Sequence, residues 1–394
     1  GVLSEPGEFT FPVDGGCAEV VAVCPRDALF SHPRSQVIAN GTAGEYFRKR
    51  SSRIRPWPHE SVEMRLGEDD TTFFEAFRSY DDIVARLHAL VSISNGTAEL
   101  LQLSPMTFEG RAIQAVRLRG SGWQPGYPRA LFTYLLHARE WIAGMTGVYA
   151  VERAIAEARA DASFLQNTEV IFVPIGNPDG FVYSSQRARF WRKNRQPNFM
   201  GGGCIGVDLN RNFEFQWEEV GRARVDARAN HACQEIYSGP KAASEPETQA
   251  LQNLVLEAPL SVSIDFHSCG GYILGPWSYT REEHPRSSEI RSLGSALKSS
   301  IEADSGSHYH FCTGNSCLYT VAGDLADFST NTGALGFTIE MRPTVQKAVG
   351  MSDFAPPPHE ILPNARENFQ AVRVALAFAR ARFGMTDEWG VGET

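Results

Sequence analysis

From about residue 69 onward, the spacing of apolar residues predicts alternating helices and strands. In segment 81–93 the apolar side chains recur so that they share one helical face. Similar helical patterns occupy four further segments: 141–160, 244–258, 287–303 and 364–383. Ser244 and Glu247 have the spacing of a capping box at the start of one of them. Apolar runs typical of strands buried on both faces occupy 130–136, 169–175, 261–266 and 336–341, and segment 111–120 alternates like a strand.

Interleaved helices and buried strands predict the α/β fold class: a single domain with a central mixed, mostly parallel sheet flanked by helices on both faces. In such sheets, functional sites gather at the carboxyl ends of the strands. We expect this domain to cover residues 69–386, followed by a C-terminal tail at 387–394. Residues 1–68 carry Gly, Pro and charge with little periodicity, and we expect an N-terminal extension that is pro-segment-like or wraps the main body.

Composition and charge exclude some classes of protein. The formal net charge is −9 and no basic block is long, which argues against a nucleic-acid partner. No apolar run reaches ~18 residues, so we expect no membrane span. The short basic stretch FRKRSSRIR (47–55) is either a solvated loop or a processing site for an activating protease, with cleavage near Arg50 or Arg53.

Several weak signals indicate a secreted glycoprotein. Asn40 and Asn95 each begin an Asn-Gly-Thr sequon. The first residues have no h-region, so a secreted chain would already have lost its signal peptide. Bridges among the seven cysteines would require an oxidising, extracellular compartment. Close spacing favours the pairs Cys17–Cys24 and Cys312–Cys317; Cys204 and Cys233 would then pair and leave Cys269 over.

Titratable residues follow two of the predicted strands. His137 and Glu140 come directly after the run that ends in LFTYLL, and a turn can point both side chains at one ion. The spacing alone is weak evidence, because such matches arise by chance. His267 stands at the end of another apolar strand, in the same kind of context. A catalytic zinc typically takes two histidines and one glutamate and keeps one position open, so these residues predict such a site.

Seven motifs then carry a resemblance to a known family. In chain order they are HAREW (137–141), NPDGF (177–181), RFWRKNR (189–195), GVDLNRNF (206–213), SIDFHS (263–268), Tyr319 and FTIEMR (337–342). The chain resembles the pancreatic-type zinc carboxypeptidases, the A/B subfamily, over residues 69 to 385. The resemblance implies one Zn²⁺ per chain, held by His137, Glu140 and His267. It implies no counterpart for residues 1–68, which are shorter than the family's globular activation domain.

The resemblance also implies roles for residues around the metal. Glu340 matches the catalytic glutamate that assists attack by a zinc-bound water, and Arg192 matches the cation that faces the oxyanion. Asp208 matches the acceptor that orients His137. Asn210 and Arg211 resemble the clamp for the terminal carboxylate of the substrate, and a planar guanidinium suits that task.

Further positions bear on substrate recognition. Tyr319 resembles the mobile tyrosine that closes over the substrate, and Asp327 keeps the family's spacing from it. Ala326 should stand at the bottom of the specificity pocket, where alanine favours an apolar or aromatic C-terminal residue. The expected pocket lining is Leu318, Val321, Gly314 and Thr338. Asp265 could bias the pocket toward cations. Arg139 and Arg189 would lie near the outer subsites, and Cys269 replaces an aromatic residue usual in the family.

The sequence thus predicts a secreted zinc metallocarboxypeptidase that releases single C-terminal residues, with A-type specificity. Its expected partners are peptide or protein C-termini, and a proteinaceous inhibitor or an activating protease; we expect a monomer. Two alternatives stay open: the same chemistry on N-acyl amino acids or other non-protein amides, and a non-catalytic protein that binds peptide C-termini. The second would be expected to have lost a ligand or the base, whereas all four residues are present.

Overall fold

The computed structural model describes residues 71–198, 203–219, 227–343 and 351–388, together with the backbone of two N-terminal strands. Those strands, β1 (Glu8–Pro12) and β2 (Ala18–Ala22), pair antiparallel with each other. The remainder of residues 1–68 lies outside the described residues, and so do Asn40 and the basic stretch 47–55. Within the part of the chain that is described, no helix is long and apolar enough to cross a membrane.

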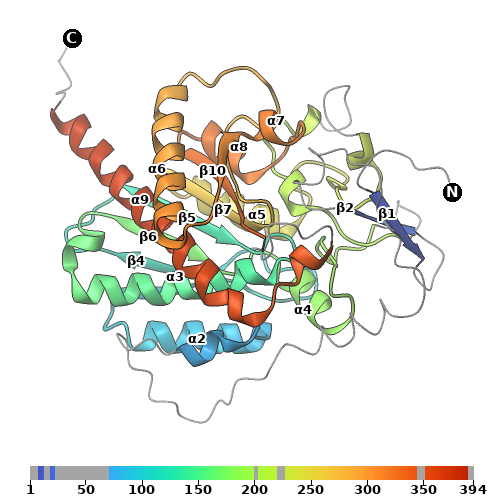
Figure 1. Ribbon diagram of the computed structural model, residues 1–394, viewed down its shortest axis with the longest axis horizontal. Helices are drawn as coiled ribbons and strands as arrows, with labels where there is room; N and C mark the ends of the chain where they lie inside the picture. Colours follow the sequence, from blue (N-terminus) through green and yellow to red (C-terminus); the bar gives the residue numbers. More distant parts are fainter. Residues whose placement is uncertain are drawn as a thin grey trace.

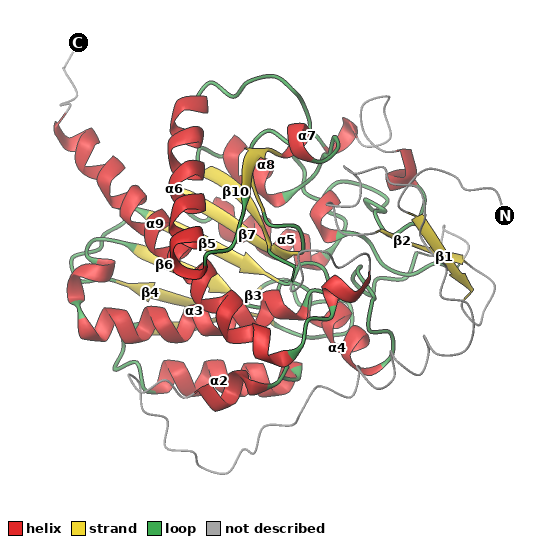
Figure 2. Cartoon of the chain, in the orientation of Figure 1, coloured by secondary structure: helices red, strands yellow, loops and turns green. Residues whose placement is uncertain are grey.

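One eight-stranded sheet forms the centre of the molecule (Figures 1 and 2). Its spatial order is β3-β4-β6-β5-β7-β10-β8-β9. The strands are β3 (Ala98–Leu103), β4 (Ile113–Arg119), β5 (Arg129–Tyr134), β6 (Glu169–Val173), β7 (Val262–Ser268), β8 (Tyr272–Gly275), β9 (His310–Thr313) and β10 (Leu335–Met341). The four central strands β6, β5, β7 and β10 run parallel, whereas β3, β4 and β8 each pair antiparallel with a neighbour. The predicted mixed, mostly parallel sheet is confirmed.

Helices cover both faces of this sheet. The larger apolar core lies between one face and the helices α2 (Tyr80–Ser92), α3 (Trp141–Ala160), α6 (Ser287–Ser305) and α9 (Ile361–Glu388), which lie in front of the sheet in Figure 1. A second core lies between the opposite face and α5 (Pro246–Leu256) and α8 (Leu325–Asn331). Strand β5 serves both cores because successive side chains point to opposite faces: Phe132 packs in the first and Leu131 in the second.

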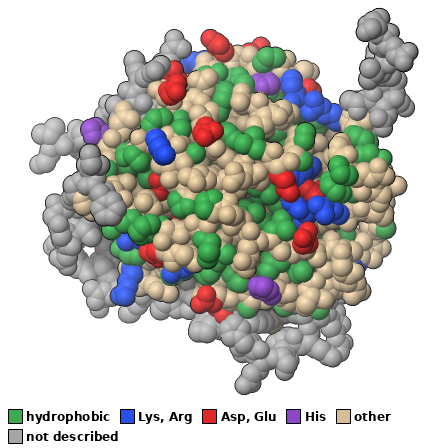
Figure 3. All heavy atoms as spheres, turned by 180° about the vertical axis from the view of Figure 1, so that it is seen from behind, with side chains coloured by type: hydrophobic (Ala, Val, Ile, Leu, Met, Phe, Trp, Pro, Cys, Tyr) green, Lys and Arg blue, Asp and Glu red, His purple; other side chains and the backbone are tan. Residues whose placement is uncertain are grey.

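The remaining elements are short. Among the described residues they include α4 (Pro178–Gln186), α7 (Gly314–Cys317) and the 3-10 turns Thr71–Glu75, Ala162–Leu165, Leu209–Arg211, Trp217–Glu219, Ala227–Asn230, Met351–Phe354 and Pro358–Glu360. On the face seen from behind, Lys and Arg side chains lie beside Asp and Glu rather than in a large patch of one sign (Figure 3).

The five predicted helices and five predicted strands all occur, with ends shifted by a few residues. The predicted capping box at Ser244 and Glu247 is wrong. Helix α5 starts at Pro246, and its N-cap residue Glu245 makes no side-chain cap hydrogen bond. Glu247 instead accepts a hydrogen bond from Asn194 in the protein interior, because a buried carboxylate needs such a partner. A capping box does occur at Ser79 and Asp82, before α2.

Candidate active site

The three predicted metal ligands and Glu340 come from three strands that are neighbours in the sheet. Strands β5, β7 and β10 lie side by side and run parallel, so their carboxyl ends meet at one edge. His137 and Glu140 follow the end of β5, while His267 is the last residue but one of β7. Glu340 on β10 is in register with His267. Chain segments distant in sequence are thus brought to one point, where open α/β sheets bind ligands.

His137, Glu140 and His267 form a compact, buried set of ligand atoms. Glu140 Oε1 lies 2.9 Å from His137 Nδ1, and Glu140 Oε2 lies 3.0 Å from His267 Nδ1. The two Nδ1 atoms are 2.9 Å apart. One ligand atom from each residue lies within 4.8 Å of the others, which is the arrangement of a group that can hold a metal ion. Two imidazole nitrogens and one carboxylate are the donor set that zinc prefers in catalytic sites, so these residues fit the ion.

Each histidine is held from behind by a carboxylate. His137 Nε2 lies 3.1 Å from Asp208 Oδ1, and His267 Nε2 lies 2.6 Å from Asp265 Oδ2. Thr133 in turn donates to Asp265 at 2.6 Å. Such partners fix the tautomer and the ring orientation of metal-bound histidines, and here they leave both Nδ1 atoms directed at the same point. Asp265 was expected only to bias the substrate pocket; its position two residues before His267, on the same face of β7, could have indicated this contact.

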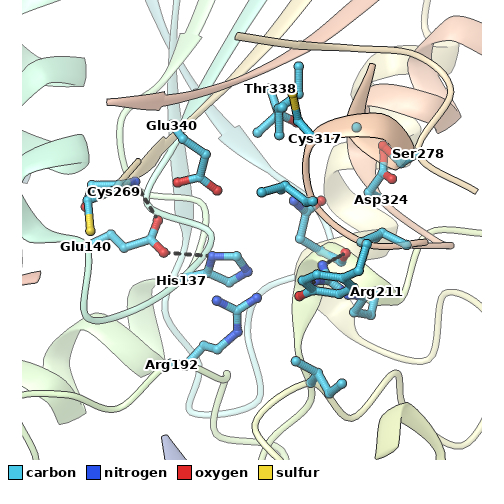
Figure 4. Close-up of a pocket in the computed structure, with 18 of the residues that line it drawn as sticks. His137, Glu140, Arg192, Arg211, Cys269, Ser278, Cys317, Asp324, Thr338 and Glu340 are labelled. Atoms are coloured by element: carbon cyan, nitrogen blue, oxygen red, sulfur yellow. Dashed lines mark hydrogen bonds and ion pairs between the residues drawn. The ribbon is translucent and has the colours of Figure 1, made fainter. Parts of the chain in front are cut away.

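Glu340 lies beside the ligand set, with its carboxyl directed toward Glu140 and His137 (Figure 4). Burial raises the pKa of its carboxyl to about 7, and the nearby Glu140 and Asp265 carboxylates add to the rise, while His267 and Arg192 oppose it. A carboxylate with a pKa near neutrality can accept a proton and give it back, which is the property of a general base.

Arg192 and Asp208 form a buried ion pair beside His137. Arg192 Nη2 donates to Asp208 Oδ2 at 2.8 Å, and its Nε donates to the same oxygen at 3.1 Å. Burial alone would raise the pKa of Asp208, but Arg192, Arg211 and His137 outweigh it and hold that pKa well below its usual range. Asp208 therefore stays ionised, orients His137 and keeps the Arg192 guanidinium on the cavity wall.

Asn210, Arg211 and Tyr319 lie together in the cavity wall. Arg211 Nη1 donates to the Asn210 carbonyl at 2.7 Å, and Arg211 Nη2 donates to the Tyr319 hydroxyl at 2.9 Å. Asn210 accepts a hydrogen bond from Leu325 N at 3.0 Å. Arg211 is buried, whereas the Tyr319 side chain is 44% exposed at the mouth of the cavity. An exposed tyrosine tied to the site by one hydrogen bond can move without disturbing the core.

The cavity next to the ligand set contains most of the expected pocket residues. Its volume is about 240 Å³, and Gly314, Leu318, Val321 and Thr338 are in its wall. Ala326 is not: it is buried in α8, although the sequence analysis placed it at the pocket bottom. Several unexpected residues line the cavity, Asp324 and Leu274 among them. Asp324 belongs to the segment between Tyr319 and α8, where spacing counted along the chain does not tell which side chain turns inward.

The two further arginines differ in position. Arg139 lines the cavity, but its Nη1 pairs with Glu235 at 2.7 Å and its guanidinium lies over the Phe354 ring. Arg189 is not in the cavity wall; it donates to the backbone carbonyls of Arg139 and Phe354 and stacks on Trp141. Arg189 therefore links the backbone of two cavity-lining residues, Arg139 and Phe354, and does not face the cavity itself.

Disulfide bonds join Cys204 to Cys233 and Cys312 to Cys317, as the sequence analysis expected. Cys269, to which spacing along the chain assigned no partner, is disulfide-bonded. Short sequence spacing does not show which cysteines the fold brings together. The expected pair Cys17–Cys24 lies outside the described residues.

Comparisons with known proteins agree with this site. The family model "Zinc carboxypeptidase" matches residues 90–371, so the chain belongs to the zinc carboxypeptidase family. The "Metallocarboxypeptidase A-like protein" of Trichophyton verrucosum is 31% identical over 338 residues, which are 84% of this chain and 76% of that protein. The "Carboxypeptidase B" of Astacus astacus is 29% identical over 77% of this chain and 97% of its own length.

A solved structure has the same fold. The carboxypeptidase A from Helicoverpa armigera superposes with a TM-score of 0.74 at 25% identity, over 86% of this chain and 81% of the other. The chain is therefore a metallocarboxypeptidase by family, and its relatives carry both A-type and B-type names.

Proposed function

We propose that this protein is a secreted zinc carboxypeptidase that releases single residues from the C-termini of peptides. The observation that carries the proposal is the convergence, in one buried cavity, of three metal ligands with Glu340, Arg192 and Arg211. Zinc held by His137, Glu140 and His267, one ion per chain, would supply a Lewis acid that polarises the scissile carbonyl and lowers the pKa of water.

The protein's own residues account for the other requirements of amide hydrolysis. Glu340 takes the proton of the attacking water and returns it to the leaving nitrogen. The nitrogen therefore leaves as an amine and not as a strongly basic anion. Arg192, already fixed by Asp208, directs its positive charge at the oxygen that becomes an oxyanion. The charge is in place before reaction, so little reorganisation is needed during it.

Recognition of a free C-terminus is assigned to Arg211, Asn210 and Tyr319. Arg211 can pair with a carboxylate through two parallel hydrogen bonds, and its Nη2 is held meanwhile by the Tyr319 hydroxyl. We propose that the terminal carboxylate displaces Tyr319 from this bond and that Tyr319 then closes over the substrate. Arg139, on the same cavity wall, would contact residues further from the C-terminus.

Two observations bear on specificity. The apolar side chains of Leu274, Leu318 and Val321 in the cavity wall support the A-type, apolar or aromatic preference proposed from the sequence. Ala326, on which that proposal depended, lies outside the wall, whereas the Asp324 carboxyl lines it. Asp324 is thus the side chain that decides between an apolar and a basic C-terminal residue.

The disulfides support secretion, because such bonds persist in oxidising compartments. A protein of similar fold has been solved in complex with a tick carboxypeptidase inhibitor, and we propose a proteinaceous inhibitor and an activating protease as partners of this protein, which we propose to be a monomer. Non-protein N-acyl amino acids also present a carboxylate next to an amide and remain a second candidate substrate. The intact ligand set and Glu340 argue against a purely non-catalytic binder.

The test is a survey of N-blocked dipeptides ending in Phe, Leu, Lys, Arg and Glu, with zinc and with a zinc chelator. We expect chelator-sensitive release of the last residue. Matched dipeptides with an amidated C-terminus serve as controls and should be poor substrates, because Arg211 then loses its charged partner. Absence of chelator-sensitive turnover with every substrate would rule out the enzymatic proposal.

A further inference from the structure

A short disulfide bond lies beside the mouth of the catalytic cavity. It joins Cys312, on strand β9 at the end of the sheet, to Cys317, the last residue of α7, and their Cα atoms are 6.1 Å apart. Cys317 lines the cavity (Figure 4), and so do Leu318 and Tyr319, which follow it in the chain. The bond therefore ties the segment that carries Tyr319 to the central sheet.

The side chain of Tyr319 is held through Arg211. Arg211 Nη2 donates to the Tyr319 hydroxyl at 2.9 Å, and the guanidinium lies 5.9 Å from the centroid of the ring. In the proposed function the terminal carboxylate of the substrate takes over this hydrogen bond. While that exchange takes place, the position of Tyr319 depends on the backbone on either side of it.

The chain after Tyr319 is fixed by hydrogen bonds. Val321 N donates to the Ser278 carbonyl at 3.0 Å. The Thr320 hydroxyl accepts a hydrogen bond from Nδ2 of Asn315 at 2.8 Å, and Asn315 is buried. On this side of Tyr319 the backbone therefore has little freedom.

The chain before Tyr319 is fixed by the disulfide. Leu318 N donates to the Gly314 carbonyl at 3.1 Å, but this bond closes the single turn of α7 on itself and does not reach the sheet. Cys317, in contrast, is bonded covalently to β9, which pairs with β8. Without the disulfide the end of α7 would have more backbone conformations, and substrate binding would have to order them.

The length of the loop that the disulfide closes indicates a local role. Cys312 and Cys317 are separated by 5 positions in the sequence, whereas Cys204 and Cys233 are separated by 29. A bond that closes a short loop restricts the unfolded chain less, so it adds less to overall stability. The effect of the shorter disulfide is therefore expected mainly on the position of the residues next to it.

We infer that the disulfide Cys312–Cys317 is a positioning element for substrate binding, which holds Tyr319 where it meets the C-terminal residue of the substrate. The inference rests on the proposed function, in which Tyr319 closes over that residue. The bond reduces the entropic cost of substrate binding, because the segment before Tyr319 is ordered beforehand. It takes no part in cleavage of the amide, so it acts on KM and not on kcat.

The test compares the unaltered protein with Cys312→Ser/Cys317→Ser, on the N-blocked dipeptide that the unaltered protein cleaves best. We expect KM to rise about 10-fold, because binding then has to order the segment before Tyr319. The value of kcat should change by less than about threefold, and the zinc content should stay the same. An unchanged KM would overturn the inference and leave the zinc carboxypeptidase proposal intact.

Cys204→Ser/Cys233→Ser is the matched control, because it removes a disulfide whose two cysteines do not line the cavity. The expected pattern is the reverse. The midpoint of denaturant unfolding should fall more than in the first variant, since a longer loop is released, while KM should stay within about twofold. An equal rise of KM in both variants would indicate general loosening of the protein and would contradict a positioning role.

Tyr319→Phe shows whether the disulfide acts through Tyr319. This substitution removes the hydroxyl that Arg211 binds. In the Tyr319→Phe background, loss of the disulfide should raise KM by less than about threefold, because the group that it positions is already gone and the two effects are not additive. A full further rise of about 10-fold, as for independent sites, would rule out action through Tyr319.

Reduction of the unaltered protein keeps the inference testable if the first variant does not fold. Cys312 and Cys317 are both partly exposed, so a trialkylphosphine can reach the bond. The phosphine gives two electrons to the disulfide and takes oxygen from water to become a phosphine oxide, and two thiols remain. Thiol labelling with peptide mapping gives the reduced fraction of each cysteine.

The apparent KM should rise as the reduced fraction of Cys312 and Cys317 grows, and it should not follow that of Cys204 and Cys233. A KM that is independent of the state of Cys312 and Cys317 would refute the inference alone. Absence of chelator-sensitive turnover of any substrate by the untreated protein would overturn both this inference and the proposed function.

Discussion

The properties of single residues in this site come from their neighbours more than from their own chemistry. Glu140 is buried and Glu340 half-buried in the wall of one cavity, yet desolvation and two nearby carboxylates raise the pKa of Glu340 to about 7, while the two histidines hold the pKa of Glu140 below its usual range. One carboxylate is therefore suited to bind a cation and the other to exchange a proton.

Glu340→Gln tests this division of roles. We expect turnover to fall by roughly 10²–10⁴-fold, because the general base is lost, while the metal content stays near that of the unaltered protein. Activity and bound zinc are measured on the same preparation. Glu99→Gln, an exposed position on strand β3, should change neither. Loss of zinc in Glu340→Gln would show that this glutamate is a ligand instead.

Asp265→Asn and Asp208→Asn test the carboxylates behind the histidines. Each should weaken zinc affinity by about 10- to 100-fold, because the ring loses the partner that orients it. Competition with a chelator of known affinity measures the effect. Asp208→Asn should also lower turnover by the zinc-loaded protein, because Arg192 loses its ion pair, whereas Asp265→Asn should affect mainly the metal. Unchanged affinity in both variants would contradict the orienting role.

Among the elements, strand β10 and helix α8 carry two parts of the site, and the packing of the two elements fixes the distance between those parts. Glu340 is near the end of β10, and Asp324 caps the start of α8. The two elements pack closely at Gly336, where an added Cβ would come within 2.1 Å of the Ala326 carbonyl oxygen and 2.6 Å of Thr330 Oγ1. The absence of a side chain at this one position sets the separation of helix and strand.

Gly336→Ala should therefore destabilise the protein by about 1–3 kcal/mol, because the backbone of α8 has to move away from β10. The midpoint of denaturant unfolding measures this. Gly384→Ala is the matched control: it lies in α9, an added Cβ meets nothing within 4 Å, and alanine favours the helix. The control should be neutral or slightly stabilising, and an equal loss in both variants would argue against the packing explanation.

At the scale of the whole molecule, a buried polar cluster that affects stability lies apart from the catalytic cavity. Asn194 donates to both Glu245 and Glu247, at 2.7 and 3.0 Å, in the interior away from the cavity. Burial raises the pKa of Glu247 from 4.5 to about 8, and Glu245 and Asp179 add to the rise. The folded state therefore holds Glu247 protonated over a range of pH in which the unfolded chain ionises it.

This shift predicts a pH-dependent loss of stability. The folded pKa lies above the unfolded value, so the contribution of Glu247 is complete below pH 4.5, declines as pH rises and is lost above about pH 8. Glu247→Gln, which is always neutral, should gain on the order of a few kcal/mol over the unaltered protein between pH 5 and pH 9. Urea unfolding at both pH values measures the difference, and a pH-independent difference would contradict the prediction.

The pattern of apolar residues was sufficient for much of the fold. Long periodic segments such as 141–160 and buried runs such as 130–136 were predicted close to their observed bounds, because core burial dominates there. Strands β1, β2, β3, β8 and β9 and helices α4, α7 and α8 were missed. They are short or lie toward the sheet edges, where burial leaves a weaker pattern; β3 and β9 are only partly buried.

The sequence alone determined which residue types were available for the chemistry. It placed His137, Glu140, His267 and Glu340 at the ends of buried strands, and a parallel sheet brings such ends together. It also carried the resemblance that assigned them to a zinc carboxypeptidase. These conclusions need only residue identity, local periodicity and motif order, which a linear sequence contains.

Only the tertiary structure decided which side chains enter the cavity. It directs Asp265 to His267, leaves Arg189 behind the pocket, places Cys269 in a disulfide and puts Asp324 rather than Ala326 in the wall. Apart from Asp265, which lies on β7 two residues before His267, each of these outcomes depends on the direction of a side chain in a loop or at a helix start. That direction is fixed by contacts between segments distant in sequence, so spacing along the chain cannot supply it.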